Sequence, residues 1–473
     1  MNNLSKTQFK QLESVKGANV QNKFLNLTFF VRTFGCQMNK HDSERIVGML
    51  EALGATGVNS IEAADVVVYM TCCVREAADE RLYGQVASIK NVELRENSPL
   101  QKRIIAIGGC IGQRDGEVLL KKLKHVDIVF GTHNISHLPS LIENVLDCGK
   151  REAEVLDESS EFSSALPQTR EHAWEAWLPI TIGCNNFCSY CIVPYVRGRE
   201  KSRELKDIMA DAESYVKAGV KEITLLGQNV NSYGRDLYGS PKFAEVLDAL
   251  DKTGIERLRF ATSHPKDLTD AVISKFSNLR CLMPALHLPV QSGSNEVLAA
   301  MNRKYTREHY LGLIDKLRSA CPDIALSTDV IVGFPGETQA DFEQTASLIN
   351  EVGFHQVFTF IYSKREGTPA AKMEDNTPHS VIQKRFDELV NIVQKRAFEL
   401  NQEDAGKTVD VLFGGTSKRN SKLLAGKSPK NQTVHAPIPE GQTAESLAGK
   451  IVPVKINEAK TWYLSGNVIE DGK

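Results

Sequence analysis

The sequence predicts a multidomain α/β protein with an N-terminal doubly wound parallel sheet, a central (β/α) barrel, partial or complete, and a small C-terminal all-β barrel. Its 473 residues are too many for one ordinary hydrophobic core. Through most of the chain, short β-branched runs alternate with helix-length amphipathic stretches, which indicates parallel strands joined by helices. From residue 404 the pattern changes to β-type runs separated by turns of Gly, Ser and Lys.

The N-terminal domain is expected at residues 25–150. Its predicted strands are residues 27–31, 66–69, 104–107 and 128–130. Ile46, Leu50 and Leu53 recur at helical spacing between the first two strands, as in a βαβ unit. Residues 1–24 lack the apolar core of a secretory signal. They are predicted to be a disordered polar tail, and the protein is expected in the cytoplasm.

The central domain is expected at residues 173–403, after a linker at residues 151–172 that is polar, rich in Ser and Glu, and without periodicity. The predicted strands are residues 179–182, 222–226, 257–260, 285–288, 326–332 and 356–362. Helix-length segments separate these strands, which is typical of a parallel barrel.

The C-terminal domain is expected at residues 404–470. Its predicted strands are residues 408–413, 433–436, 451–456 and 462–468. Residues 407–460 contain nine Lys and Arg against four Asp and Glu, a net charge of +5 in a chain whose total is −2. Lys418, Arg419 and Lys422 are predicted to lie on turns of this barrel, where they suit contacts with phosphates. A solvated charged face is the alternative interpretation.

Bulk composition excludes some classes of protein. No apolar run approaches the roughly 20 residues that a membrane span needs. The net charge of −2 argues against a uniformly basic nucleic-acid binder. In a reducing compartment, the ten cysteines are not expected to form disulfides. Clustered cysteines there act as metal ligands or nucleophiles, whereas isolated ones are usually packed in the core.

The strongest signal is a C-x3-C-x2-C run, formed by Cys184, Cys188 and Cys191 just after the first predicted barrel strand. Three thiolates on one short loop can hold three irons of a [4Fe–4S] cube and leave the fourth iron without a protein ligand. An open iron can bind a substrate, as the open position of a catalytic zinc does. A structural zinc loop is the alternative, but no fourth ligand stands at the spacing of a zinc finger.

A second set of cysteines is dispersed. Cys36, Cys72 and Cys110 each follow a predicted strand of the N-terminal sheet. Because the carboxyl ends of parallel strands share one edge, the three are expected to meet there and to hold a second [4Fe–4S] cluster, whose open iron can hold sulfur. Three core thiols are the alternative, but those would fall within strands. Adjacent strand residues point in opposite directions, so only one of Cys72 and Cys73 is expected to ligate.

The compact cysteine loop resembles that of radical SAM enzymes, in which S-adenosylmethionine (SAM) chelates the open iron. With the N-terminal trio and a C-terminal domain that resembles TRAM domains, residues 29–469 are similar to the methylthiotransferases. The family's Thr-Cys pattern favours Cys72 over Cys73 as the ligand. Beyond the six cysteines, the resemblance identifies no catalytic residue. It places these residues around SAM: Gln291, Ser292, Gly333, Gly336 and Glu337.

Residues 35–39, 226–234 and 262–265 carry a closer resemblance, to the family members that act on tRNA. It implies methylthiolation of C2 of N6-dimethylallyladenosine at position 37 of the anticodon loop, through a SAM-derived radical. A radical is needed because the aromatic C2–H is inert toward acid–base chemistry, and the base must leave its stack to be reached. Flavodoxin or ferredoxin as electron donor, an unidentified sulfur donor and a monomeric state are further expectations.

Other functions stay open at this point. Sister groups of the family methylthiolate threonylcarbamoyl-adenosine in tRNA or an aspartate of a ribosomal protein, but they resemble residues 226–234 and 262–265 poorly. An RNA-binding iron–sulfur electron carrier is the alternative outside enzymes. A carrier would have fully ligated clusters and no need of a barrel.

Overall fold

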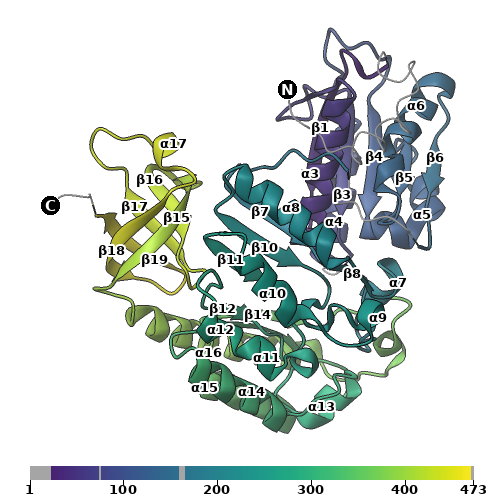
Figure 1. Cartoon of the computed structure of the whole chain (residues 1–473). Coiled ribbons are helices and arrows are strands. Elements are labelled where there is room, and N and C mark those ends of the chain that lie inside the picture. Colours follow the sequence, from purple (N-terminus) through teal and green to yellow (C-terminus); the bar gives the residue numbers. More distant parts are fainter. Residues whose placement is uncertain (1–22, 74–75, 159–165, 470–473) are drawn as a thin grey trace. The chain divides into compact units, whose positions relative to one another are not determined.

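The computed structural model describes residues 23–73, 76–158 and 166–469, which divide into two compact units (Figure 1). The first unit holds the chain up to Glu171 together with residues 182–185 and 191–200. The second holds residues 172–181, 186–190 and 201–473. Of the predicted tail, residues 1–22 lie outside the described residues. Phe24 is buried in the core of the first unit, so the ordered chain begins before the predicted boundary at residue 25.

The first unit is built on one parallel sheet with the strand order β2-β1-β3-β4-β5-β6. Its strands are β1 (Thr28–Thr33), β2 (Thr56–Gly57), β3 (Val66–Thr71), β4 (Ile104–Gly109), β5 (Ile128–Phe130) and β6 (Glu152–Glu154). The first five follow the flavodoxin-like order 2-1-3-4-5, which confirms the predicted doubly wound sheet. The sequence missed β2, which is only two residues long, and β6.

Different helices cover the two faces of this sheet, because successive strand residues point to opposite sides. Val66, Val68 and Met70 pack with residues of α3 and α6, whereas Val67 and Tyr69 pack with residues of α4 and α5. The helices of the unit are α3 (Gln37–Ala52), α4 (Glu76–Ile89), α5 (Cys110–Lys122), η1 (Ile135–His137), α6 (Leu138–Cys148) and α7 (Val193–Val196). The central strands β3, β4 and β5 are thus buried on both sides, as is usual for parallel sheets covered by helices.

The stretch predicted as a linker is partly built into the first unit. Strand β6 lies within it and pairs with β5. Near its other end, Gln168 donates a hydrogen bond to the Glu44 carboxylate (2.6 Å), and Thr169 donates one to Glu51 (2.6 Å), so α3 anchors this segment. Residues 159–165 of the predicted linker lie outside the described residues. Polar composition alone did not reveal these anchors, since they depend on α3.

The second unit contains six parallel strands in two hydrogen-bonded groups, β7-β10-β11 and β12-β13-β14. A parallel bridge between Leu258 and Leu282 connects the groups. The strands are β7 (Glu175–Pro179), β10 (Glu222–Leu226), β11 (Arg257–Phe260), β12 (Ala285–His287), β13 (Ala325–Val332) and β14 (Gln356–Ile361), and the short β8 (Thr181–Ile182) and β9 (Lys201–Ser202) lie between β7 and β10 in the chain. In the described chain the series runs from β7 to β14 as a partial barrel, one of the two predicted forms. The first barrel strand lies earlier than the predicted residues 179–182.

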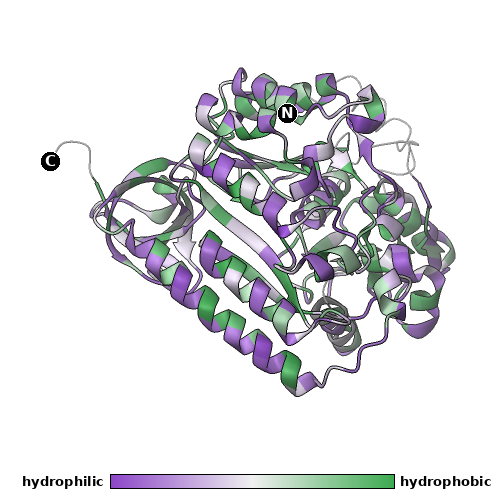
Figure 2. Cartoon of the chain, turned by 90° about the horizontal axis from the view of Figure 1, so that it is seen from below, coloured by the Kyte–Doolittle hydropathy of each residue, from purple (hydrophilic) through white to green (hydrophobic). Residues whose placement is uncertain are grey.

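Helices follow the barrel strands and cover the outside of the barrel (Figure 1). They are α8 (Leu205–Lys217), η3 (Val230–Ser232), α9 (Arg235–Tyr238), α10 (Phe243–Asp251), η4 (Pro265–Asp267), α11 (Asp270–Ile273), α12 (Lys275–Asn278), α13 (Asn295–Ala300), α14 (Arg307–Ala320), α15 (Gln339–Val352), η5 (Pro369–Lys372) and α16 (His379–Gln402). Hydrophilic and hydrophobic residues alternate along them, as expected for helices with one face on a sheet (Figure 2). No helix among the described residues is long and apolar enough to cross a membrane.

The C-terminal domain, part of the second unit, is a closed barrel with the strand order β15-β16-β17-β19-β18. Its elements are β15 (Thr408–Ser417), β16 (Asn420–Lys427), β17 (Thr433–Pro437), α17 (Ala444–Leu447), β18 (Ile451–Ala459) and β19 (Tyr463–Val468). The small all-β barrel is confirmed. The sequence missed β16, because its Lys, Asn and Gly residues are typical of turns, whereas pairing with two neighbours stabilises it as a strand.

One close contact tests the packing of the N-terminal sheet. A Cβ atom added at Gly108 would lie 2.0 Å from the ring of Phe130, which is fully buried. We expect Gly108→Ala to destabilise the first unit by about 1–3 kcal/mol through overpacking, measured as a lower midpoint of thermal unfolding. Gly84→Ala on α4 is the matched control, because its Cβ would meet nothing within 4 Å and Ala favours a helix. An unchanged midpoint for Gly108→Ala would contradict this packing.

Candidate functional site

Three of the predicted ligands lie at the carboxyl edge of the N-terminal sheet. Cys36 follows β1 as the residue before α3, Cys72 directly follows β3, and Cys110 follows β4 as the first residue of α5. These three strands are neighbours in the order β1-β3-β4, and the gap between β1 and β3 is the switch point at which such folds bind ligands.

Glycines allow the three loops to approach one another. A Cβ at Gly35 would lie 2.2 Å from Cβ of Cys72, and one at Gly109 would lie 2.6 Å from the carbonyl oxygen of Thr71. Both glycines have positive φ angles (112° and 85°), which other residues rarely adopt. The Thr71 hydroxyl donates to the carbonyl of Gly108 (2.6 Å) and so fastens the β3 loop to the β4 loop.

The thiols of this edge are close enough to change one another's acidity. A hydrogen bond with Cys72 lowers the pKa of Cys36 to about 5 against the opposing effect of burial, and the nearby Arg197 and the first amides of α3 add to this. A hydrogen bond with Cys73 lowers the pKa of Cys110, again against burial and with help from Arg197. Cys36 and Cys110 therefore favour the thiolate form that binds metal.

Cys73 differs from Cys36 and Cys110, because its pKa is raised. It is fully buried in the apolar cluster between the sheet and the helices α4 and α5. Its hydrogen bond to Cys110 and its burial raise its pKa, so it remains a thiol. Cys72 thus lies beside Cys36, whereas Cys73 packs in the core beside Cys110, and Cys72 as the ligand of the pair stays a prediction.

The compact trio lies on the loop between β8 and α7. Cys184 and Cys191 belong to stretches of the first unit, and Cys188 belongs to the second. Cys188 is buried, whereas the other two are partly exposed. The backbone around Cys188 is held by the turn after α13, because Ser189 N donates to the carbonyl of Met301 (3.0 Å) and the Asn302 side chain donates to that of Phe187 (2.8 Å).

The chemistry of the donors fits iron–sulfur clusters. Among residues 23–73, 76–158 and 166–469, no three His, Cys, Asp or Glu side chains are grouped around a point where one metal ion could sit. A four-iron cube distributes three ligands over three irons, so its thiols need not converge on one atom. Soft thiols are the ligands that such clusters take, and the pKa is lowered for Cys36 and Cys110 of the dispersed trio; the other trio lies on a C-x3-C-x2-C loop.

A group of polar residues that the sequence analysis did not assign to a site lies at the carboxyl ends of the first barrel strands. Within the part of the chain that the structure describes, these buried atoms have no hydrogen-bond partner: Thr181 Oγ1, Gln228 Oε1, Asn229 Oδ1, Asn231 Nδ2 and Ser263 Oγ. Buried polar atoms without partners are rare in proteins and often face a ligand. The signal was present in the sequence as the polar stretches 228–232 and 262–264, which follow two strands.

The residues expected around SAM lie after β12 and β13. Gln291 has a positive φ of 72° and is buried. The Ser292 hydroxyl is fully buried and lies 3.2 Å from that of Thr345 on α15. Gly333 and Gly336 also have positive φ angles, and a Cβ at Gly336 would meet nothing within 4 Å, so the backbone there is open to a ligand.

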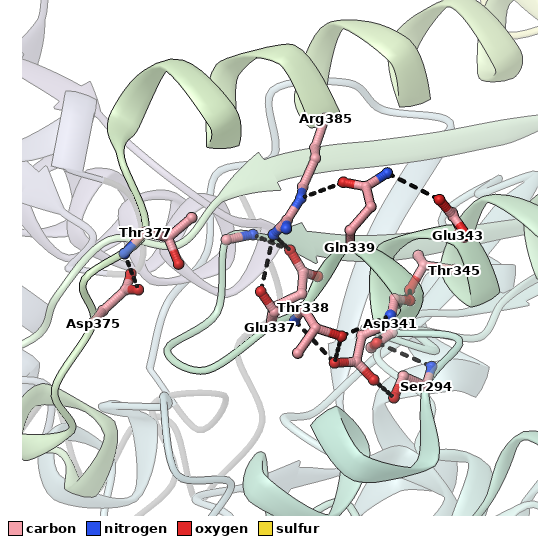
Figure 3. Close-up of polar contacts among 12 residues, drawn as sticks. Ser294, Glu337, Thr338, Gln339, Asp341, Glu343, Thr345, Asp375, Thr377 and Arg385 are labelled. Carbon is pink, nitrogen blue, oxygen red and sulfur yellow. Dashed lines mark hydrogen bonds and ion pairs between the residues drawn. The ribbon is translucent and has the colours of Figure 1, made fainter.

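The Glu337 side chain shapes this loop. Its carboxylate accepts hydrogen bonds from the Gly333 amide (2.8 Å) and from Arg385 on α16 (3.3 Å). Figure 3 shows Arg385 reaching Glu337 from α16. Burial raises the pKa of Glu337 to about 6, although the Gly333 amide and Arg385 act in the other direction. The residue thus holds the glycine-rich loop against α16.

The basic residues of the C-terminal barrel have different surroundings. Lys418 and Arg419 form the exposed turn between β15 and β16, as predicted. Lys422 is exposed but lies in β16, so the expectation of a turn is wrong for it, because Asn420–Lys427 pairs as a strand. Lys430 forms an ion pair with buried Asp404 (3.1 Å) and is therefore engaged within the fold. Trp462 is 52% exposed.

Three families match parts of the chain. Residues 178–349 match the radical SAM superfamily, residues 28–131 match the uncharacterized protein family UPF0004, and residues 402–469 match the TRAM domain. A solved radical S-adenosylmethionine methyltransferase, TsrM from Kitasatospora setae, superimposes with a TM-score of 0.52 over 82% of this chain and 80% of its own. At 12% identity, that likeness shows the fold alone.

Curated relatives match almost the whole chain, and each of three is named tRNA-2-methylthio-N(6)-dimethylallyladenosine synthase. The one from Thermoanaerobacter sp. (strain X514) is 46% identical and covers 98% of this chain and 97% of its own. That from Carboxydothermus hydrogenoformans is 45% identical (93% and 99% covered), and that from Bacillus anthracis is 45% identical (94% and 86% covered). With this much shared sequence over nearly its full length, the chain belongs to the family of these synthases, the radical SAM methylthiotransferases.

Proposed function

We propose that this protein methylthiolates C2 of N6-dimethylallyladenosine at position 37 of tRNA, the activity that the names of its relatives describe. The observation that carries the proposal is the convergence of Cys36, Cys72 and Cys110 at one sheet edge, in a chain that also holds a C-x3-C-x2-C loop. One cysteine trio is enough for SAM chemistry. A second one supports a reaction that must also hold sulfur.

Six cysteines would hold the two clusters. Cys36, Cys72 and Cys110 would ligate one [4Fe–4S] cluster, and Cys184, Cys188 and Cys191 would ligate the cluster to which SAM binds. When bound, SAM and these clusters supply the radical chemistry and the sulfur that replacement of an aromatic C–H bond requires. The protein's own contribution is to keep the six thiols reactive, to bind SAM and to present the base.

The barrel residues support the binding of SAM and the base. The unpartnered atoms of Gln228, Asn229, Asn231 and Ser263 offer donors and acceptors in a buried setting, where a polar ligand would satisfy them. Gly336 leaves the backbone open to a ligand, Gly333 allows the loop to pack against Ile382 of α16, and Glu337 keeps the loop in place. Gln291 and Ser292 hold the neighbouring loop close to β13 and α15.

The C-terminal barrel would provide affinity for tRNA. Lys418, Arg419 and Lys422 are exposed cations suited to phosphates, and exposed Trp462 can stack on an unpaired base. The target base lies in the anticodon loop, where leaving the stack costs less than in a duplex. A monomer in the cytoplasm that receives electrons from flavodoxin or ferredoxin is consistent with this activity.

Variants of the two cysteine sets should lose different products. We expect Cys184→Ala to abolish formation of 5′-deoxyadenosine and of the 2-methylthio nucleoside, because the site for SAM is lost. Cys36→Ala should still form 5′-deoxyadenosine but yield no 2-methylthio product. Nucleoside mass spectrometry of tRNA and chromatography of the SAM products measure both, and anaerobic reconstitution should give about eight irons per chain, about four per cluster.

The control for this pair is Cys148→Ser, which changes an exposed cysteine at the end of α6, far in the sequence from both sets. It should leave both products unchanged. A reconstituted protein that binds zinc and little iron would refute the proposed function. A Cys36→Ala variant that keeps making the 2-methylthio nucleoside would refute the role given to the dispersed trio.

The tRNA footprint can be tested through salt. Changing Lys418, Arg419 and Lys422 together to Ala should weaken tRNA binding and flatten its dependence on salt, because each lost phosphate contact lowers the log–log slope by about 0.7–0.9. The preference for a prenylated over an unmodified adenosine should persist, since an apolar tail must be recognised in a pocket of the barrel. Binding titrations at several salt concentrations with both tRNAs measure the two effects.

A matched control changes three exposed lysines outside the C-terminal barrel to Ala instead. They are Lys372 of η5 and Lys384 and Lys395 of α16. The loss of charge is the same, so an equal flattening in both variants would mean that only net charge matters. An unchanged slope in the first variant would place the tRNA contacts elsewhere.

A further inference from the structure

A buried arginine accompanies the dispersed cysteine trio. Arg197 follows α7, and its side chain is 7% exposed. Its guanidinium donates to the Asn39 side-chain oxygen (2.9 Å) and to the Asp42 carboxylate (3.3 Å), on the helix that begins just after Cys36. The charges of Cys36, Cys110 and Asp42 favour the charged form of this arginine although it is buried.

The position of Arg197 is fixed by the loops that carry the thiols. The Asn39 amide nitrogen donates to the carbonyls of Phe34 (2.7 Å) and Thr71 (2.8 Å), so its oxygen is the atom left to accept from Arg197. Thr132 donates to the carbonyl of Val196 (2.7 Å), which holds the end of α7 against the loop after β5. Hydrogen bonds from several loops thus fix the guanidinium at the carboxyl edge of the sheet.

A second buried arginine contacts the compact trio. Arg303 is 4% exposed, and it donates to Sγ of Cys188 (3.4 Å), to the hydroxyl of Tyr305 (2.9 Å) and to the carbonyl of Pro289 (2.8 Å). No carboxylate pairs with it in the described part of the chain. A buried cation without an anionic partner is unstable, so a negative charge at the Cys188 side is what this site requires.

We propose that Arg197 and Arg303 are positioning residues for the two clusters: Arg303 donates a hydrogen bond to a ligand sulfur, and each arginine balances the charge of its own cluster. This inference rests on the proposed function, because it takes the two trios as cluster ligands. Hydrogen bonds to sulfur and nearby charge set the reduction potential of such clusters. Reduction adds negative charge, so a neighbouring cation makes it more favourable.

The experiment measures each cluster alone in the full-length chain. A background with Cys184, Cys188 and Cys191 changed to Ala retains the dispersed trio, and one with Cys36, Cys72 and Cys110 changed to Ala retains the compact trio. Iron content and the midpoint potential, followed by electron paramagnetic resonance without SAM, are the readouts. Arg197→Gln should lower the potential of the first cluster only, and Arg303→Gln that of the second only, so each variant is the control for the other. Arg→Lys at either position should restore most of the potential.

Asp42→Asn provides a test of opposite sign that does not need Arg197 to be removed. It keeps the size of the side chain but removes the carboxylate that partly neutralises Arg197, so the potential of the first cluster should rise. If Arg197→Gln takes up no iron, the Asp42→Asn variant decides the question. A higher potential of the first cluster supports the proposal, and an unchanged or lower potential overturns it.

Several further results would contradict the proposal or the function on which it rests. Unchanged potentials in both Gln variants, or equal shifts of both clusters in each, would overturn the proposal. Loss of SAM binding by Arg303→Gln with no shift in potential would mean that Arg303 serves SAM rather than the cluster. A parent protein that takes up no iron would instead refute the proposed function, so the two failures are distinguishable.

Discussion

The close approach of three loops at the carboxyl edge of the N-terminal sheet is the constraint on which the candidate site depends. Strands β1, β3 and β4 are neighbours, so the chain leaves the sheet three times within a small area. Side chains at Gly35 or Gly109 would block that approach, since their Cβ atoms would overlap Cys72 and Thr71. The Asn39 amide nitrogen then joins the β1 and β3 loops, because it donates to the carbonyls of Phe34 and Thr71. Cysteines far apart in sequence therefore share one site.

Burial of thiols at this edge creates an electrostatic requirement that other parts of the first unit satisfy. Thiolates are costly to bury unless a positive charge or hydrogen-bond donors face them. The guanidinium of Arg197 does so for buried Cys110, and Asp42 in turn balances Arg197. Arg303 beside Cys188 is a similar arrangement in the second unit, on an unrelated set of elements. Both cysteine sets thus combine soft ligands with a cation that is itself held by backbone carbonyls or an amide oxygen.

The charged residues of the C-terminal barrel divide into two classes with different consequences. Arg257 and Arg259 of β11 donate to the backbone carbonyls of residues 410 and 427–429, which fastens the small barrel to the parallel strands of the same unit. Lys430 is paired with Asp404. Lys418 and Arg419, by contrast, stand on an exposed turn. Net charge alone therefore overstates the cations available to a nucleic acid, and the exposed turn is the part that can respond to salt.

The sequence by itself determined the order of three domains and most strands, and it singled out six cysteines as predicted ligands, because periodicity and motif spacing are local properties of the chain. The β-branched runs of β3, β4 and β5 were recognisable for this reason, and so was the rule that residues after parallel strands meet at one edge. Only the tertiary structure decided that Asn420–Lys427 is a strand, that residues 152–154 join the sheet and that Cys73 packs beside Cys110. It also placed Arg197 at the trio and left the polar atoms near Gln228 without partners. Each of these depends on contacts between residues far apart in the chain, which no local pattern records.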